Sequence, residues 1–153
     1  MKDAFGGIVN IVLVAIFLVI ISGILGLGVN YTKAFRMKNA IISAIEQYEG
    51  ASGCFTDAKS GCQTLILKKA SELGYSQTAL NCSTNDRFNK DVSNLFCYRR
   101  DDSIKEDNSK LKNNYTYTIV TQVNIDIPII NNMMGLSIFQ VHGDTRPLSI
   151  WKN

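Results

Sequence analysis

The strongest constraint on this chain is the run from Ile8 to Val29, which is apolar apart from Asn10 and Ser22. A helix rising about 1.5 Å per residue crosses the roughly 30 Å hydrocarbon core of a bilayer with about 20 residues. A buried helix of a small soluble domain would instead carry a polar stripe. We therefore expect a transmembrane helix over residues 8–29, preceded by residues 1–7 as a short tail or leader.

A cleaved signal peptide is the alternative interpretation of this run. The apolar stretch is longer than the usual ~7–15 residues of a signal-peptide core. The small-residue site after it, Gly26-Leu27-Gly28, is a poor version of the preferred alanine pattern, and no cysteine there is available for lipid attachment. These features favour a retained anchor, with the lipid bilayer as the first partner of the chain.

The helical pattern continues beyond the apolar run as an amphipathic extension over residues 30–50. Its apolar stripe has the spacing of one helix face and consists of Met37, Ile41, Ala44, Ile45 and Tyr48. No proline or turn cluster interrupts residues 8–48, and residues 50–53 supply a glycine C-cap and a loop. We therefore expect one continuous helix, roughly 60 Å long, whose first half lies in lipid and whose second half packs on a head.

Three positions in the apolar run are candidate sites of helix assembly. Ser22 and Gly26 are four residues apart, and small residues at this spacing allow a second helix to approach closely in lipid. Simple tolerance of glycine in membrane helices is the alternative reading. Asn10 is the only amide in the first half of the run, where it can bond to a neighbouring helix or to water and headgroups at the interface.

The head, residues 51–153, is long enough for one small domain with a limited core, and it contains four cysteines. An even number of cysteines in a tethered small domain is typical of disulfides formed outside the cytosol. We favour Cys54–Cys62 and Cys82–Cys97, because both pairings close short local loops. A zinc site is disfavoured, since no two of these cysteines have the tight spacing that such sites use, and Cys-x-x-Cys is absent.

Charges and cysteines point to opposite membrane orientations. Lys33, Arg36 and Lys38 follow the span, whereas only Lys2 and the terminal amine precede it, so a count of positive charges places the head inside. The cysteines and the very short N-terminal tail favour the outside, and long domains translocate despite flanking charge. We expect a single-pass membrane protein with its C-terminal domain outside the cytosol.

The first part of the head shows helix, loop and strand patterns in turn. Residues 63–73 predict a short helix that Gly74 ends, and residues 76–94 predict a polar loop. Leu95 to Tyr98 is expected to be a first strand, and Arg99 to Asn114 a solvated hairpin loop. The mixed sign of the charges in this loop argues against a nucleic-acid partner.

The strongest β pattern extends from Tyr115 to Ile127, where apolar and polar residues alternate and place one apolar face on the helix stripe. Pro128 ends this strand because it lacks a hydrogen-bond donor. Residues 129–135 are apolar and are expected to form a short helix or loop near the membrane or the core.

A final strand is expected from Ser137 to His142, with a turn at Gly143-Asp144 and an edge segment from Arg146 to Trp151. The predicted fold class is therefore α+β. A long N-terminal transmembrane and amphipathic helix packs on a small antiparallel sheet.

This order of elements resembles that of type IV pilin-like proteins. The C-terminal part of the chain looks like the C-terminal strands of tight-adherence (TadE-like) pseudopilins. The resemblance lies in the segment from Val123 to Pro128, followed by Gly135 and by Thr145-Arg146. The resemblance implies a pilin-like fold and a subunit of a cell-surface filament or secretion apparatus. Its implied partners are other pilin-like subunits and an assembly or secretion platform, in a homo- or hetero-oligomer whose core is made by the apolar helices.

Pilins of this kind carry a glycine before the apolar helix, where a prepilin peptidase cuts, and a glutamate as the fifth residue of the mature chain. Phe5-Gly6-Gly7-Ile8 supplies the glycine, so the resemblance implies a possible leader cleavage between Gly7 and Ile8. The chain departs from the pilin pattern at the glutamate, because cleavage there would place Val12 at the fifth position.

Residues suited to catalysis are sparse. His142 is the only histidine, with no serine or cysteine near it in a recognisable arrangement, and the carboxylate pairs Asp101-Asp102 and Glu106-Asp107 lie in a polar loop. No phosphate-binding glycine loop, zincin helix or nucleophile elbow is present. We therefore expect no enzyme activity, cofactor or metal. The alternative function is a single-pass envelope protein whose head binds a ligand without polymerising, and a secretion-system component would differ mainly in its partners.

Overall fold

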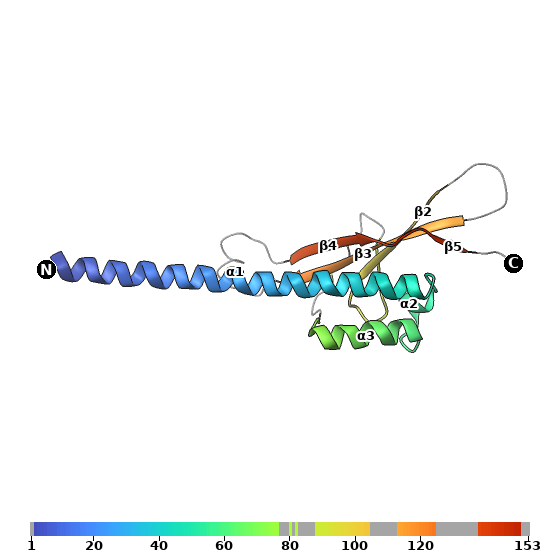
Figure 1. The fold of residues 1–153 in the computed structure, drawn as a ribbon, viewed down its shortest axis with the longest axis horizontal. Coiled ribbons are helices and arrows are strands. Elements are labelled where there is room, and N and C mark those ends of the chain that lie inside the picture. The colour runs from blue at the N-terminus through green and yellow to red at the C-terminus, as the bar shows by residue number, and fades with distance from the viewer. Residues whose placement is uncertain are drawn as a thin grey trace.

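One helix extends through most of the length of the molecule. The computed structural model describes residues 2–76, 80, 82, 88–104, 113–124 and 138–150, and in it α1 runs unbroken from Lys2 to Gln47. The N-terminal half of α1 projects away from the other elements, and the C-terminal half lies alongside a small head (Figure 1). The expected continuous helix is confirmed, and it begins earlier than Ile8.

Two short helices and a sheet complete the described part of the fold. The further helices are α2 (Gly53–Thr56) and α3 (Gly61–Leu73). The strands are β1 (Asn89–Lys90), β2 (Cys97–Ile104), β3 (Asn113–Asn124), β4 (Ile138–Asp144) and β5 (Leu148–Ile150). Within the described residues every strand pairing is antiparallel, in the order β1-β2-β3-β4 with β5 also on β3. The predicted α+β class, a long helix on a small antiparallel sheet, is therefore observed.

The core of the head lies between α1 and one face of β3. The buried residues of α1 are Ala34, Met37, Ile41, Ala44 and Ile45. The residues of β3 that face them alternate along the strand and are Tyr115, Tyr117, Ile119, Thr121 and Val123. The Thr121 hydroxyl also donates a hydrogen bond to the Ala34 carbonyl at 3.1 Å. The predicted stripe therefore faces the predicted strand.

Tyr48 is the exception in this stripe, because 39% of its surface remains exposed. The helix ends at Gln47, so Tyr48 lies in the following turn, and its ring lies against Gly61. Both Glu49 and Gly50 have positive φ values, of 51° and 68°. The Gly50 N–H donates to the Ile45 carbonyl at 2.8 Å, which is a glycine C-cap of the kind expected from the sequence.

The helix α3 agrees with its prediction and begins two residues before the expected start. Ser60 is its N-cap, with the Ser60 hydroxyl accepting from the Gln63 N–H at 3.1 Å. Gly74 ends it in the left-handed conformation, with φ of 58°.

The charged segment from residue 99 differs from the expected hairpin loop. Residues 99–104 continue β2, and Asn113 and Asn114 begin β3. Arg99 pairs with Thr118 and Arg100 with Tyr117, so the backbone hydrogen bonds of the ladder outweigh the polarity of the side chains. The middle of the predicted loop, residues 105–112, lies outside the described residues.

Three smaller predictions were also wrong. The polar loop predicted over residues 76–94 contains β1, which pairs with β2. Leu95 and Phe96 are buried but precede β2, because their N–H groups bond to the Asp91 carboxylate instead of to a strand. Gly143-Asp144 is not a turn, since both residues extend β4 along β3. The predictions for Pro128 and residues 129–135 lie outside the described residues.

The strands β4 and β5 lie end to end along one edge of β3. Thr118 pairs with Asp144 and Tyr115 with Leu148, so this edge has one residue more than β3 between the pairs and forms a bulge. At the bulge, the Thr145 N–H donates to the Tyr117 carbonyl at 2.9 Å, and the Thr145 hydroxyl accepts from the Tyr117 N–H at 3.0 Å. The expected edge segment is therefore present as β5.

Candidate functional site

The candidate functional surface is the N-terminal half of α1. Apart from Leu27, which is half-buried, the large apolar side chains of residues 8–29 are between 38% and 71% exposed. By length and composition, α1 is able to cross a membrane, and none of its most apolar window is buried against described residues of the head. An exposed apolar surface of this size is unfavourable in water. Lipid or other apolar helices around it would remove that cost.

The candidate assembly residues all lie on this exposed surface. Ser22, Gly23 and Gly26 line a shallow depression, bordered by Leu18 and Val19. Asn10, Ser22 and Gly26 are each exposed, so the described part of the head contacts none of them. The side chains of Asn10 and Ser22 are therefore free to contact a neighbouring helix, and the absence of a side chain at Gly26 allows such a helix to approach closely.

The residues around the possible leader cleavage are also accessible. Gly7 is exposed, and a methyl group placed on it would meet nothing within 4 Å; Ile8 is 62% exposed. Both residues lie within α1.

A cationic and aromatic segment follows the apolar run. Tyr31 and Phe35 are 49% and 43% exposed, and Lys38 Nζ lies 4.4 Å from the centroid of the Phe35 ring. Lys33 and Arg36 form no ion pair within the described residues. Tyrosine with lysine and arginine is typical of the boundary between the hydrocarbon core and water.

Two disulfides bind the head together, and they are the local pairings favoured above. Cys54–Cys62 joins α2 to α3, with the Cα atoms 5.0 Å apart. Cys82–Cys97 joins residue 82 to the start of β2, with the Cα atoms 5.7 Å apart. All four sulfur atoms are therefore used in disulfides.

A buried polar network links α3 to the loop before β2. Asp91 is 2% exposed, and its Oδ1 accepts from the N–H groups of Leu95 and Phe96 at 2.7 and 2.9 Å. Its Oδ2 accepts from Gln63 Nε2 at 2.9 Å and from both the N–H and the hydroxyl of Ser93. The Ser60-x-x-Gln63 spacing has the form of a capping box, but the Gln63 amide donates to Asp91 and Ser93 instead of reaching back to Ser60, so this spacing did not predict the network.

Of the residues considered for catalysis, His142 and Asp101 have side chains that the structure describes, and each has its own neighbours. His142 is exposed, with its ring centroid 6.4 Å from that of Phe88, and Asp101 accepts from the Arg99 guanidinium at 3.1 Å. Glu106 and Asp107 lie outside the described residues. Among the described residues, no three His, Cys, Asp or Glu side chains are grouped as metal ligands would be.

The hydroxyl pKa values of two tyrosines in the head are raised, which favours the neutral form of each. Burial raises the pKa of the Tyr98 hydroxyl, and the negative charge of Asp91 raises it further. Burial also raises the pKa of the Tyr115 hydroxyl, against the opposing positive charge of Arg100. The Tyr115 hydroxyl donates to the Glu49 carbonyl at 2.9 Å, which secures the turn after α1.

Comparison of this chain with protein-family models, curated proteins and solved structures gives no match. The features that indicate a function are therefore the exposed apolar helix, the head to which it is joined and the two disulfides.

Proposed function

We propose that this chain is a membrane-anchored, pilin-like or pseudopilin subunit of a cell-surface filament or secretion apparatus, acting by helix–helix assembly. The observation that carries the proposal is the division of α1. Residues 8–29 are largely exposed and largely apolar, whereas Ala34 to Ile45 provide the buried face of α1 in the head. The bilayer covers the apolar half before assembly, and equivalent helices of neighbouring subunits cover it afterwards.

The junction between the two halves supports assembly over the alternative, a binding head on a flexible stalk. Ala34 is fully buried only five residues after Val29, and no break in α1 separates them. The head therefore follows any rotation or translation of the apolar half. Packing the apolar helices of several subunits would place their heads at fixed, repeated positions, which a filament requires.

The disulfides support a location of the head outside the cytosol. Both are formed among residues of the head, and such bonds persist in oxidising compartments. In this orientation, Lys33 and Arg36 lie at the outer surface of the membrane. The proposed partners are lipid and other pilin-like subunits, and the proposal includes no catalytic step or cofactor.

The first test is the intact mass of the native protein from its own cells, combined with membrane fractionation and alkylation without a reductant. A chain that lacks residues 1–7 and has no free thiol would support peptidase processing and an oxidising location. A full-length, membrane-bound chain with oxidised cysteines would favour the binding head or an unprocessed pseudopilin. Free thiols at all four cysteines would contradict the proposed orientation.

A second test addresses assembly directly. Ser22→Cys places a thiol on the depression in α1, and Asn39→Cys places one at an exposed position beside the head. With a short bis-maleimide, Ser22→Cys should give cross-linked dimers in the sheared surface fraction, since each subunit then has a single free thiol. A chain that stays monomeric at both positions would contradict assembly, and a cross-linked dimer from Asn39→Cys alone would assign the contact to the heads.

A further inference from the structure

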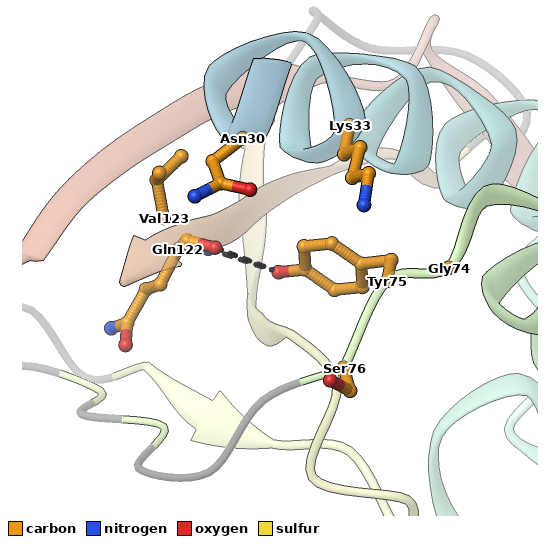
Figure 2. Close-up of a pocket in the computed structure, with 7 residues that line it drawn as sticks. All are labelled: Asn30, Lys33, Gly74, Tyr75, Ser76, Gln122 and Val123. Atoms are coloured by element: carbon orange, nitrogen blue, oxygen red, sulfur yellow. Dashed lines mark hydrogen bonds between the residues drawn. The ribbon is translucent and has the colours of Figure 1, made fainter. Parts of the chain in front are cut away.

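A polar pocket lies where α1 passes from its apolar half to the head. The pocket has a volume of about 130 Å³ and is lined by residues from three parts of the fold (Figure 2). Asn30 and Lys33 come from α1, residues 74–76 follow α3, and Gln122 and Val123 come from β3. This volume is too small for an extended organic ligand but is adequate for a phosphate-sized group.

Lys33 is the cation of this pocket. Its side chain extends from α1 towards Gly74, and a methyl group placed on Gly74 would lie 3.7 Å from Lys33 Nζ (Figure 2). Between Ile8 and Ile45 the charged residues are Lys33, Arg36 and Lys38, and all are positive. The surroundings of the pocket on α1 therefore attract an anion.

Two other lining residues carry hydrogen-bond donors that face solvent. Asn30 and Ser76 are both exposed and supply an amide and a hydroxyl. The Tyr75 hydroxyl is already engaged, because it accepts from the Gln122 N–H at 3.2 Å and donates to the Gln122 carbonyl at 3.1 Å. The donors for a ligand are therefore Lys33, Asn30 and Ser76.

The depth of the pocket identifies the source of the anion. Lys33 is four residues beyond Val29, which is about 6 Å along the helix axis. The headgroup region extends roughly 5–7 Å beyond the hydrocarbon core on each side. With residues 8–29 in the hydrocarbon core, the pocket opens at the level of the lipid phosphates.

We propose that this pocket binds the phosphate of a membrane phospholipid, with Lys33 Nζ as the cation and Asn30 and Ser76 as donors. The inference rests on the proposed membrane span of α1. A bound lipid would set the rotation of α1 about its axis, and with it the orientation of the head on the membrane. Free inorganic phosphate shares the same chemistry and is the competing source.

The structural alternative is that Lys33 serves the fold alone. Gly74 follows the carbonyl end of α3, where a nearby cation is stabilising. In that case the substitution of Lys33 would lower stability without changing any lipid affinity. The experiment therefore needs both readouts.

The test uses the full chain in dodecyl maltoside micelles, with the amide NMR signals of Gly74 and Ser76 as reporters. Dihexanoyl-phosphatidylglycerol and inorganic phosphate are titrated separately. We expect saturable shifts with the lipid and weaker shifts of the same signals with phosphate. Lys33→Gln should weaken lipid binding about fivefold or more, because one charge-assisted contact is lost. Lys38→Gln removes the same charge outside the pocket and should leave binding unchanged.

Several results would overturn the proposal. Equal weakening by the two substitutions would indicate general attraction to the basic segment, and tighter saturation by inorganic phosphate would assign the pocket to the free ion. Unchanged binding in Lys33→Gln, with a lower melting temperature, would assign Lys33 to the end of α3. Alkaline carbonate extraction of the same variant distinguishes failure of the lipid-binding proposal from failure of the proposed membrane anchor. Retention of the variant in the membrane pellet would show that the anchor is intact, whatever the pocket binds.

Discussion

At the scale of single residues, buried polar groups complete the backbone hydrogen bonding where strands end. The ladder between β2 and β3 begins with the pair Cys97 and Val120. Farther along β3, the Tyr75 hydroxyl bonds to both the N–H and the carbonyl of Gln122. A side chain therefore takes the place of a strand partner and ties the end of α3 to the sheet.

Tyr75→Phe should lower the free energy of unfolding by about 1–3 kcal/mol, because the buried backbone groups of Gln122 lose this partner. Urea unfolding of the full chain in mild detergent, followed by circular dichroism, measures the change. Tyr48→Phe is the control, since Tyr48 is 39% exposed, and it should change stability by less than about 0.5 kcal/mol. Equal effects of the two substitutions would contradict the assigned role.

The raised pKa values of Tyr98 and Tyr115 predict a loss of stability in alkali. In the unfolded chain, both hydroxyls titrate near the ordinary value of 10.0. Above that pH the unfolded state binds fewer protons than the folded state, so stability falls as pH rises towards the folded pKa values. Below it, both states are protonated and the contribution of these two groups is complete.

Urea unfolding at a series of pH values, with phenolate absorbance recorded in parallel, checks this prediction. The double variant Tyr98→Phe/Tyr115→Phe should show a smaller alkaline loss than the parent chain. An unchanged loss would assign it to other titrating groups.

At the scale of elements, the turn at the end of α1 depends on both a left-handed backbone conformation and close packing against the sheet. Gly50 has φ of 68°, and a methyl group placed on it would come within 2.9 Å of Tyr117 Cε2 and 3.0 Å of both Leu148 Cδ1 and the Tyr115 hydroxyl. These atoms belong to β3 and β5, so the turn after α1 is packed directly on the sheet. The direction in which the head folds back on the helix depends on this contact.

Gly50→Ala should therefore cost about 2–4 kcal/mol, since left-handed strain and overpacking add. Gly74→Ala is the matched control. Gly74 also has a positive φ, of 58°, but a methyl group there meets only Lys33 Nζ at 3.7 Å. It should lose only about 1 kcal/mol. Thermal unfolding of both variants gives the comparison, and similar losses would show that packing at Gly50 contributes little.

The two disulfides should differ in their resistance to reduction. Cys54 and Cys62 are 0% and 1% exposed, whereas Cys82 is only partly buried. A thiol reductant should therefore open Cys82–Cys97 first under native conditions. Alkylation at successive times, followed by peptide mass mapping, gives the order.

Removing Cys82–Cys97 by a double alanine substitution should cost about 3 kcal/mol, as expected for its loop of sequence separation 15. Simultaneous appearance of all four thiols would contradict the order and indicate that reduction requires unfolding of the whole head.

At the scale of the whole molecule, anchor and head share one helix, so the apolar half can be tested without altering the head. Val14 and Leu18 lie near the middle of the apolar run and are 54% and 60% exposed. Val14→Lys/Leu18→Lys should cost roughly 5–7 kcal/mol of membrane insertion, by the sum of two central lysines. The fraction resisting alkaline carbonate extraction should fall sharply.

The control for this variant is Ser43→Lys/Gln47→Lys, which adds the same charge at exposed positions beside the head. It should remain in the membrane pellet. Equal retention of both variants would contradict insertion of residues 8–29 in lipid. Intact disulfides in each would show that the head still folds.

Local patterns were sufficient to predict a large part of this fold. The apolar run, the stripe from Met37 to Ile45, the cap at Gly74 and the alternation along β3 are all repeated or short-range signals within one element. The favoured disulfides are also local, since each closes a short loop. Such features depend on helix and strand periods that hold before any tertiary contact forms.

The remaining features depend on residues that are distant in the chain. Pairing with β3 makes the charged residues 99–104 a strand, and packing against α1 extends β4 through Gly143. The bonds from Gln63 to Asp91 and from Tyr75 to Gln122 likewise join separate elements. The pocket beside Lys33 exists only because α1, the end of α3 and β3 meet there. No periodicity predicts these contacts, because each requires the packed arrangement of elements that the whole head imposes.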